Sequence, residues 1–147
     1  MPDISLKIVT PERVVHEDTV DSLSVMTESG EITILPNHAP LVSLLKAGEM
    51  RLKSGGEESL LAVSTGVIEV RPGSEIVVLA DTAERSDELA LEEVQKSKEL
   101  AEKRLEEARE QNDIAYAGAL VHLERELARL KVAQKGKYRD VGKKLNS

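Results

Sequence analysis

The sequence offers few side chains that could carry out acid–base, nucleophilic or metal chemistry. Cysteine is absent, and the three histidines, His16, His38 and His122, lie far apart in the chain. None of them has a metal-ligand spacing with another. Glycine-rich phosphate loops and the Gly-x-Ser-x-Gly pattern of a nucleophile elbow are also missing. We therefore expect no catalysis, no bound metal and no cofactor, and we expect each histidine to be structural or exposed.

Charge is the more informative chemical feature. The formal net charge is −7, yet from Ile114 onward eight bases stand against three acids. Four of these bases, named here the basic edge, fall at spacings of four, two and four: Arg125, Arg129, Lys131 and Lys135. On a helix they favour contact with an acidic partner. The alternative is that they only keep the helix soluble and balance the acidic segment before it.

The first part of the chain has the pattern of a β-sheet protein. Up to about Ala80 the apolar residues fall in short runs that alternate where this can be judged, as in Ile4, Leu6 and Ile8. Turn residues interrupt these runs often, and the turn at residues 72–74 predicts a hairpin between two strands rich in β-branched residues. The spacing predicts an antiparallel β-sandwich over residues 1–85.

The second part has the pattern of a helical hairpin. From Ser86 to Lys135 the chain has no proline and one glycine, and it is rich in strong helix formers. Ser86 is expected to cap a first helix that runs to about residue 110. Asn112 and Asp113 are expected to cap a second helix, with Gly136 as its C-cap. The chain is thus predicted to be α+β, with an antiparallel α-helical hairpin and a basic tail over residues 86–147.

Each predicted helix carries an apolar stripe through which the two could pack. The stripe of the first helix is thin and small, with Lys98 in one slot, and the stripe of the second is mostly leucine. The first consists of Leu91, Val94, Ala101, Leu105 and Ala108, and the second of Tyr116, Leu120, Leu123, Leu127 and Leu130.

Composition excludes several classes of protein. No window approaches the roughly 18 consecutive apolar residues of a membrane span, and the first residues lack a signal-peptide pattern. We expect no direct membrane insertion, and the lack of cysteine agrees with a cytoplasmic location. Nucleic-acid binding is disfavoured because the chain is acidic, lacks stacking aromatics in its first part and shows no recognised motif.

Two segments resemble those of a known family. Residues 30–42, with the sequence GEITILPNHAPLV, are similar to a segment in which a glycine turn and a strand lead into Leu-Pro-x-His-x-Pro-Leu. Residues 64–70, STGVIEV, and 77–85, VVLADTAER, are similar to Gly-Gly-Phe-x-Glu-Val and Val-Leu-Ala-Asp-x-Ala-Glu-Arg. Their order, and the helical pair that follows, resemble the epsilon subunit of bacterial F-type ATP synthases to about Lys135.

This resemblance implies a non-catalytic rotor subunit in the central stalk of the enzyme. Its sandwich would bind the gamma subunit and the c ring, and Glu31 and His38 match family positions at the end near the ring. The helical hairpin would lie on the sandwich or extend toward the alpha and beta subunits of the catalytic head and restrain ATP hydrolysis. The implied location is peripheral, on the cytoplasmic face of the bacterial plasma membrane.

The sequence departs from the family pattern at the start of the first helix. Some bacterial members carry a nucleotide-binding signature there, but its aspartate is replaced by Ala90 and its arginine by Glu93. We therefore expect no tight ATP binding. Two other classes stay open from the residues alone: a free-standing adaptor or chaperone-like protein, and, more remotely, an enzyme, for which the sequence offers no cluster of reactive groups.

Overall fold

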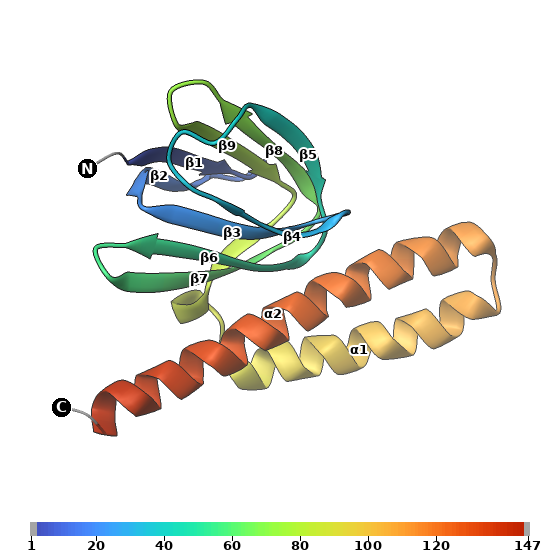
Figure 1. Ribbon diagram of the computed structural model, residues 1–147. Coiled ribbons are helices and arrows are strands. Elements are labelled where there is room, and N and C mark those ends of the chain that lie inside the picture. The colour runs from blue at the N-terminus through green and yellow to red at the C-terminus, as the bar shows by residue number, and fades with distance from the viewer. Residues whose placement is uncertain (1–2, 146–147) are drawn as a thin grey trace.

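The computed structural model describes residues 3–145, with side chains described through residue 136. Ten strands come first and helices follow (Figure 1). The strands are β1 (Ile4–Val9), β2 (Val14–Val20), β3 (Ser22–Thr27), β4 (Gly30–Ile34), β5 (Leu41–Leu45), β6 (Gly48–Ser54), β7 (Glu57–Val63), β8 (Gly66–Arg71), β9 (Glu75–Ala80) and β10 (Ala83–Arg85). The helices are a 3-10 turn η1 (Ser86–Glu88), α1 (Leu91–Arg109) and α2 (Asp113–Leu145).

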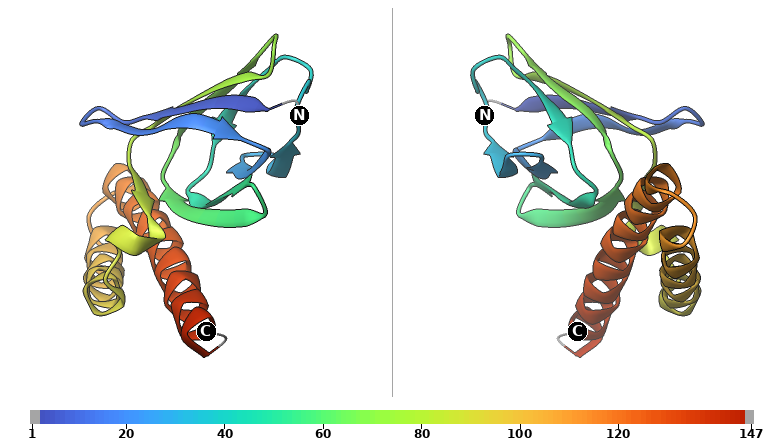
Figure 2. Two further views of the ribbon diagram at one scale, coloured as in Figure 1. Left: turned by 90° about the vertical axis from the view of Figure 1, so that its left-hand side faces the viewer. Right: turned by 90° about the vertical axis from the view of Figure 1, so that its right-hand side faces the viewer.

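The strands form one continuous sheet that curls into a sandwich. Their order is β10-β7-β6-β3-β5-β8-β9-β1-β2, and β4 pairs with β3 outside this path. The predicted sandwich and its β8–β9 hairpin are confirmed, and the hairpin is in register from Gly66 opposite Ala80 to Arg71 opposite Glu75. The described pairs are antiparallel except for β1 with β9, which run parallel. The two helices lie together beside β6 and β7 (Figure 2).

The main core is aliphatic and comes from the strands alone. Alternate residues of β1, namely Ile4, Leu6 and Ile8, are at most 1% exposed, which confirms the alternation seen in the sequence. The buried members of this core all precede Ser86 in the chain. A second, small cluster lies where helix meets sheet, and it joins Val132 to strand β7. The helices therefore contribute nothing to the main core.

Gly66 shows how tightly two strands of the sandwich approach. A Cβ atom placed at Gly66 would overlap the carbonyl oxygen of Leu79 and lie 2.8 Å from the Cα of Ala80. Both are backbone atoms of β9, which cannot move aside without breaking the hairpin. This contact is the physical reason for glycine at the start of β8.

The helix ends differ from the prediction in two places. Ser86 does not cap the first helix, because β10 and the 3-10 turn continue to Glu88 and α1 begins only at Leu91, after Ala90. The intervening Leu89 packs on the small cluster beneath α2, which holds the chain in this path. Asn112 caps α2 as predicted, since its Oδ1 accepts a 2.8 Å hydrogen bond from the Ala115 amide.

Gly136 is not a C-cap, because α2 continues through it to Leu145. The side chains of the predicted basic tail lie outside the described residues. Gly136 instead lies against η1, where a Cβ atom would be 2.9 Å from the Cβ of Ser86. Packing against Ser86 therefore explains this glycine, and one glycine inside a helix costs only about 1 kcal/mol relative to alanine.

The structure confirms the apolar stripe predicted for the first helix but not the one predicted for the second. The predicted stripe of α1 is confirmed, since Val94, Ala101 and Ala108 are its buried residues. On α2, by contrast, Leu127 is 44% exposed, and the buried apolar residues are the smaller Ala128, Val132 and Ala133. The reason is that α2 contacts α1 on one side and strands β6 and β7 on another, so its closest contacts require small side chains. Within the described residues no helix is long and apolar enough to cross a membrane.

Candidate functional site

The surface on which α2 lies is built by register across three neighbouring strands. Ala62 of β7 is paired with Glu49 of β6 on one side and with Glu84 of β10 on the other. Paired residues in a sheet point to the same face, so an apolar position is flanked by two carboxylates. Leu60 and Val132 complete the apolar centre with Ala62. We call Glu49 and Glu84 the flanking carboxylates.

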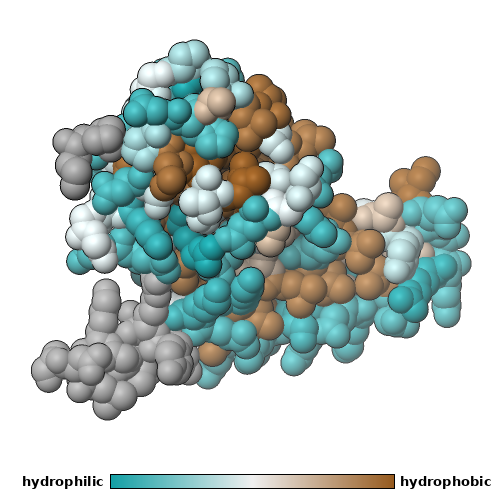
Figure 3. Space-filling view, in the orientation of Figure 1, coloured by the Kyte–Doolittle hydropathy of each residue, from teal (hydrophilic) through white to brown (hydrophobic). Residues whose placement is uncertain are grey.

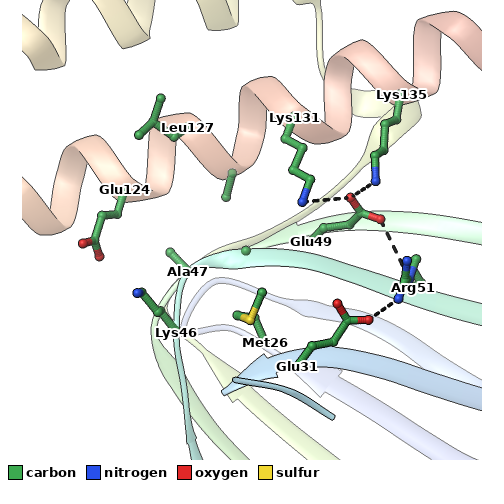
Figure 4. A pocket seen from close by; sticks show the side chains of 12 residues that line it. Met26, Glu31, Lys46, Ala47, Glu49, Arg51, Glu124, Leu127, Lys131 and Lys135 are labelled. Carbon is green, nitrogen blue, oxygen red and sulfur yellow. Dashed lines mark hydrogen bonds and ion pairs between the residues drawn. The ribbon is translucent and has the colours of Figure 1, made fainter. Parts of the chain in front are cut away.

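Two lysines of α2 converge on the first flanking carboxylate. Lys135 Nζ donates to Glu49 Oε2 at 2.6 Å, and Lys131 Nζ lies 3.8 Å from the same oxygen (Figure 4). The Glu49 side chain is only 6% exposed, whereas both lysines are about half exposed. Arg51 Nε lies 4.0 Å from the other oxygen of Glu49 and its guanidinium also pairs with Glu31. A nearly buried carboxylate is thus surrounded by three cations.

The second flanking carboxylate binds an arginine of α2 through both of its oxygens. Arg129 Nε lies 2.7 Å from Glu84 Oε1, and Nη2 lies 3.2 Å from Oε2. Its Nη1 also donates to Glu126 Oε2 at 2.7 Å, and Glu126 is 3% exposed. Burial lowers the pKa of Arg129, but the hydrogen bonds to Glu84 and Glu126 outweigh it and raise that pKa overall. Arg129 therefore remains charged in this bidentate contact with Glu84.

The basic edge is in fact divided into two pairs. Arg125 and Arg129 are four residues apart, as are Lys131 and Lys135; Arg129 reaches Glu84 of β10, whereas the two lysines reach Glu49 of β6. Val132, at the apolar centre, lies between them around the helix. The step of two residues between the pairs turns the helix by about 200°, so the four bases do not all lie on one side of α2. The cations lie on both sides of the docking face.

Arg125 makes its contacts within α2. Its Nη2 donates to Nδ1 of His122 at 2.7 Å, and its Nε is 3.8 Å from Glu126 Oε1. Burial and then the nearby Arg125 lower the pKa of His122, which favours the neutral imidazole. Burial and then Arg85 likewise lower the pKa of His16. Both histidines are partly buried partners of arginines, and among the described residues no group of three His, Asp or Glu could hold a metal ion.

Glu31 and His38 lie at opposite ends of the β4 segment. Glu31 is exposed next to the β3–β4 turn, where it pairs with Arg51. His38 is four residues beyond the end of β4, and its Nδ1 lies 2.7 Å from the carbonyl oxygen of Ala39. The neighbouring Asn37 amide bonds to Ser74 Oγ at 2.7 Å, which places this loop beside the β8–β9 turn. The structure therefore does not bring the two side chains together into one cluster.

Ala90 and Glu93 lie at the start of α1, beside a cavity of about 470 Å³ lined by residues of η1, α1 and α2. Ala90 is exposed and Glu93 is exposed in the first helical turn. Among the described residues, the charged side chains that line the cavity are the acids Asp87 and Glu92. Their negative charge opposes a phosphate group at this position.

An exposed apolar row crosses the outer face of the sandwich. Register places Leu44 of β5 opposite Val67, Val67 opposite Leu79, Leu79 opposite Val9, and Val9 opposite Val14. Leu44, Leu79 and Val14 are each about half exposed. Apolar surface is visible on the β5 side of the sandwich in Figure 3. An aliphatic row across five strands is a surface suited to another protein.

The sequence identified the bases of this interface but missed their acidic partners. Glu84 belongs to the VLADTAER segment, so its position could have been singled out. Glu49 carries no local signal, because its pairing with Lys131 and Lys135 depends on which strand lies under the helix. Glu126 could have been found as an acid three residues before Arg129 on one helix.

An N-terminal sandwich whose flank is covered by a helical hairpin defines the class of protein. The ATP synthase delta/epsilon chain beta-sandwich domain matches residues 3–86. The chain is 44% identical over 133 residues to an ATP synthase epsilon chain of Halalkalibacterium halodurans, covering 90% of this chain and 98% of that one. It is 43% identical to that of Desulforamulus reducens, covering 88% and 96%. The chain therefore belongs to the ATP synthase epsilon chain family.

Solved structures show the same fold at low identity. A chain in the cryo-EM structure of the Euglena gracilis mitochondrial ATP synthase, containing OSCP, F1 and the c ring, superposes with a TM-score of 0.76 at 19% identity. That match covers 91% of this chain and 82% of the other. A chain of the Tetrahymena thermophila central stalk and c ring gives 0.60 at 11% identity, covering 88% and 96%.

Proposed function

We propose that this chain is a non-catalytic rotor subunit in the central stalk of a bacterial F-type ATP synthase. It couples rotation of the c ring to ATP synthesis in the catalytic head, and its helical hairpin restrains ATP hydrolysis. The observation that carries this proposal is the similarity to ATP synthase epsilon chains over about nine tenths of the chain, sandwich and helices included. The subunit acts peripherally at the cytoplasmic face of the membrane.

The sandwich, residues 1–85, is proposed to bind the gamma subunit and the c ring. The exposed aliphatic row from Leu44 to Val14 supports a broad protein contact, because its central positions belong to neighbouring strands of a rigid sheet. We assign this row to gamma. Glu31 and His38 are proposed to lie at the contacts with the ring and gamma, one near each end of the β4 segment.

The hairpin, residues 86–147, is proposed to be the regulatory element. In the docked form, Arg129, Lys131 and Lys135 contact the flanking carboxylates of the sandwich. In an extended form the basic edge would face acidic surface on the alpha and beta subunits and restrain hydrolysis. The small size of the apolar cluster under α2 supports a contact that can open.

The test is performed on the assembled enzyme. ATP hydrolysis is compared in complexes that contain the full chain or a chain ending at residue 85, with proton pumping measured in the same vesicles. We expect faster hydrolysis without the hairpin and retained coupling. Equal hydrolysis rates would contradict the regulatory role. Purification of the native protein free of gamma and ring subunits would instead support the free-standing adaptor.

A further inference from the structure

Three cations of α2 are already paired with carboxylates inside the molecule. Glu49 accepts from Lys135 and lies near Lys131, and Glu84 binds Arg129 through two oxygens. Of the four bases of the basic edge, these three contact the sandwich, whereas Arg125 is engaged with His122 and Glu126 on its own helix. These three cations thus face carboxylates on the sandwich of the same chain.

We propose that Glu49 and Glu84 form an internal acidic decoy, which masks Arg129, Lys131 and Lys135 and competes with any acidic protein surface for these three cations. This inference deepens the proposed regulatory role and rests on it for its consequence in the enzyme. The masking itself is a property of the isolated chain. A side chain such as Lys135 cannot give its short hydrogen bond to Glu49 and to a second carboxylate on a distant surface at once.

The geometry favours a mask over an incidental set of surface pairs. Ion pairs between exposed side chains stabilise little, but Glu49 is 6% exposed and the Arg129–Glu84 contact is bidentate and largely shielded. The two carboxylates also lie on either side of Ala62, in register. They therefore contact cations of α2 on both sides of Val132. Docking therefore requires both contacts to form together.

The buried apolar cluster described between α2 and the sandwich is small. Beneath α2 the buried cluster consists of Leu60, Ala62 and Val132, with Leu89 partly buried beside it. The main core lies wholly within the strands. Loss of a flanking carboxylate should consequently shift the helix toward the undocked form rather than unfold the sandwich.

The first experiment measures docking in the isolated full chain. Because the chain has no cysteine, Lys46→Cys and Leu127→Cys introduce two labelling sites at exposed positions that line one pocket between the sandwich and α2, so the two labels are close in the docked form. We expect Glu49→Gln and Glu84→Gln each to raise the population with a long label distance by about tenfold, as expected for loss of one charge-assisted contact. Asp18→Asn is the control, since its carboxylate lies on β2 and accepts from the adjacent Thr19 amide.

A charge reversal keeps this test independent of packing defects. Glu49→Lys should open the hairpin, and adding Lys131→Glu and Lys135→Glu should restore the short distance. Equal distance distributions in the native chain and in the Glu49→Gln and Glu84→Gln variants would overturn the mask. Failure of the reversed charges to restore docking would overturn it as well.

The second experiment measures the competition directly with polyglutamate as the acidic probe. The Glu49→Gln, Glu84→Gln double variant should bind it about tenfold more tightly than the native chain at low salt, and high salt should abolish the difference. Equal affinity would overturn the decoy. In the assembled enzyme the same variant should hydrolyse ATP more slowly than native. Unchanged hydrolysis, together with tighter polyglutamate binding, would refute the regulatory role and leave the mask in place.

Discussion

Two glycines of α2 allow the docked interface to be tested with the same chemical change at two positions. Gly118 has open space where a Cβ atom would be, whereas at Gly136 a Cβ would lie 2.9 Å from Ser86 Cβ and 3.4 Å from its Oγ. Replacing either residue by alanine improves the intrinsic helix propensity by about 1 kcal/mol. Only at Gly136 must a neighbour move to make room.

The expected effects follow from these two contributions. Gly118→Ala should stabilise the helical hairpin by about 1 kcal/mol. At Gly136 the same gain is offset by overpacking, which costs about 1–3 kcal/mol in a close contact. Gly136→Ala should therefore be neutral or destabilising by up to about 2 kcal/mol. The helix can escape this strain only by leaving the sandwich, so the docking energy sets an upper limit to the loss.

Denaturant unfolding of the full chain, followed by far-UV circular dichroism, measures both variants. Ser86→Gly removes the atom that clashes, so the double variant with Gly136→Ala should recover the gain seen at Gly118. A coupling free energy of about 1 kcal/mol or more is expected between positions 86 and 136. If Gly136→Ala stabilises the chain as much as Gly118→Ala does, α2 does not lie against Ser86 as described.

Four further outcomes are expected. A chain of residues 1–85 should unfold cooperatively, because the main core lies within the strands, and a broad, non-cooperative transition would contradict this. Gly66→Ala should destabilise that sandwich by more than about 2 kcal/mol in the same denaturant assay, since the new methyl group overlaps the Leu79 carbonyl; a smaller loss would mean that β8 and β9 can separate. Titration calorimetry should detect no tight ATP binding, given Ala90, Glu93 and the acidic lining of the nearby cavity, and micromolar affinity would disprove the expectation. Replacing the basic edge by alanine should raise ATP hydrolysis of the assembled enzyme, more at low salt than at high salt, and rates equal at every ionic strength would exclude an electrostatic restraint.

Much of the fold could be predicted from local sequence signals. Alternation in Ile4, Leu6 and Ile8 and the turn at residues 72–74 give the strands and a hairpin, because neighbouring strands need only a short turn to pair. The parallel pairing of β1 with β9 could not be predicted in this way. It joins segments separated by most of the sandwich, and only the closure of the whole sheet determines it.

The helix boundaries show where local rules fail against tertiary packing. Ser86 has the side chain of a good cap, but the packing of Leu89 beneath α2 delays the helix to Leu91. Gly136 resembles a helix stop, yet close approach to Ser86 makes glycine useful inside the helix. In the candidate site, spacing revealed the bases, whereas the identity of Glu49 as their partner depended on the register of β6 with β7.

The two faces of α2 differ in what holds them, and this decides which one opens more readily. Toward α1 the contact is made by small apolar residues over the length of the helix, including Val94, Ala101 and Ala108. Toward the sandwich a short apolar centre is flanked by charges that water and salt can replace. Separating the helices exposes apolar surface with no substitute partner, whereas undocking the pair exposes mainly groups that water solvates well. The hairpin should therefore leave the sandwich with its two helices still packed, turning about the extended residues Leu89 and Ala90 between η1 and α1. An acidic surface on another subunit can then bind the cations of α2 in place of Glu49 and Glu84, without any loss of helix–helix packing. A few charges can therefore control the movement of the whole helical hairpin.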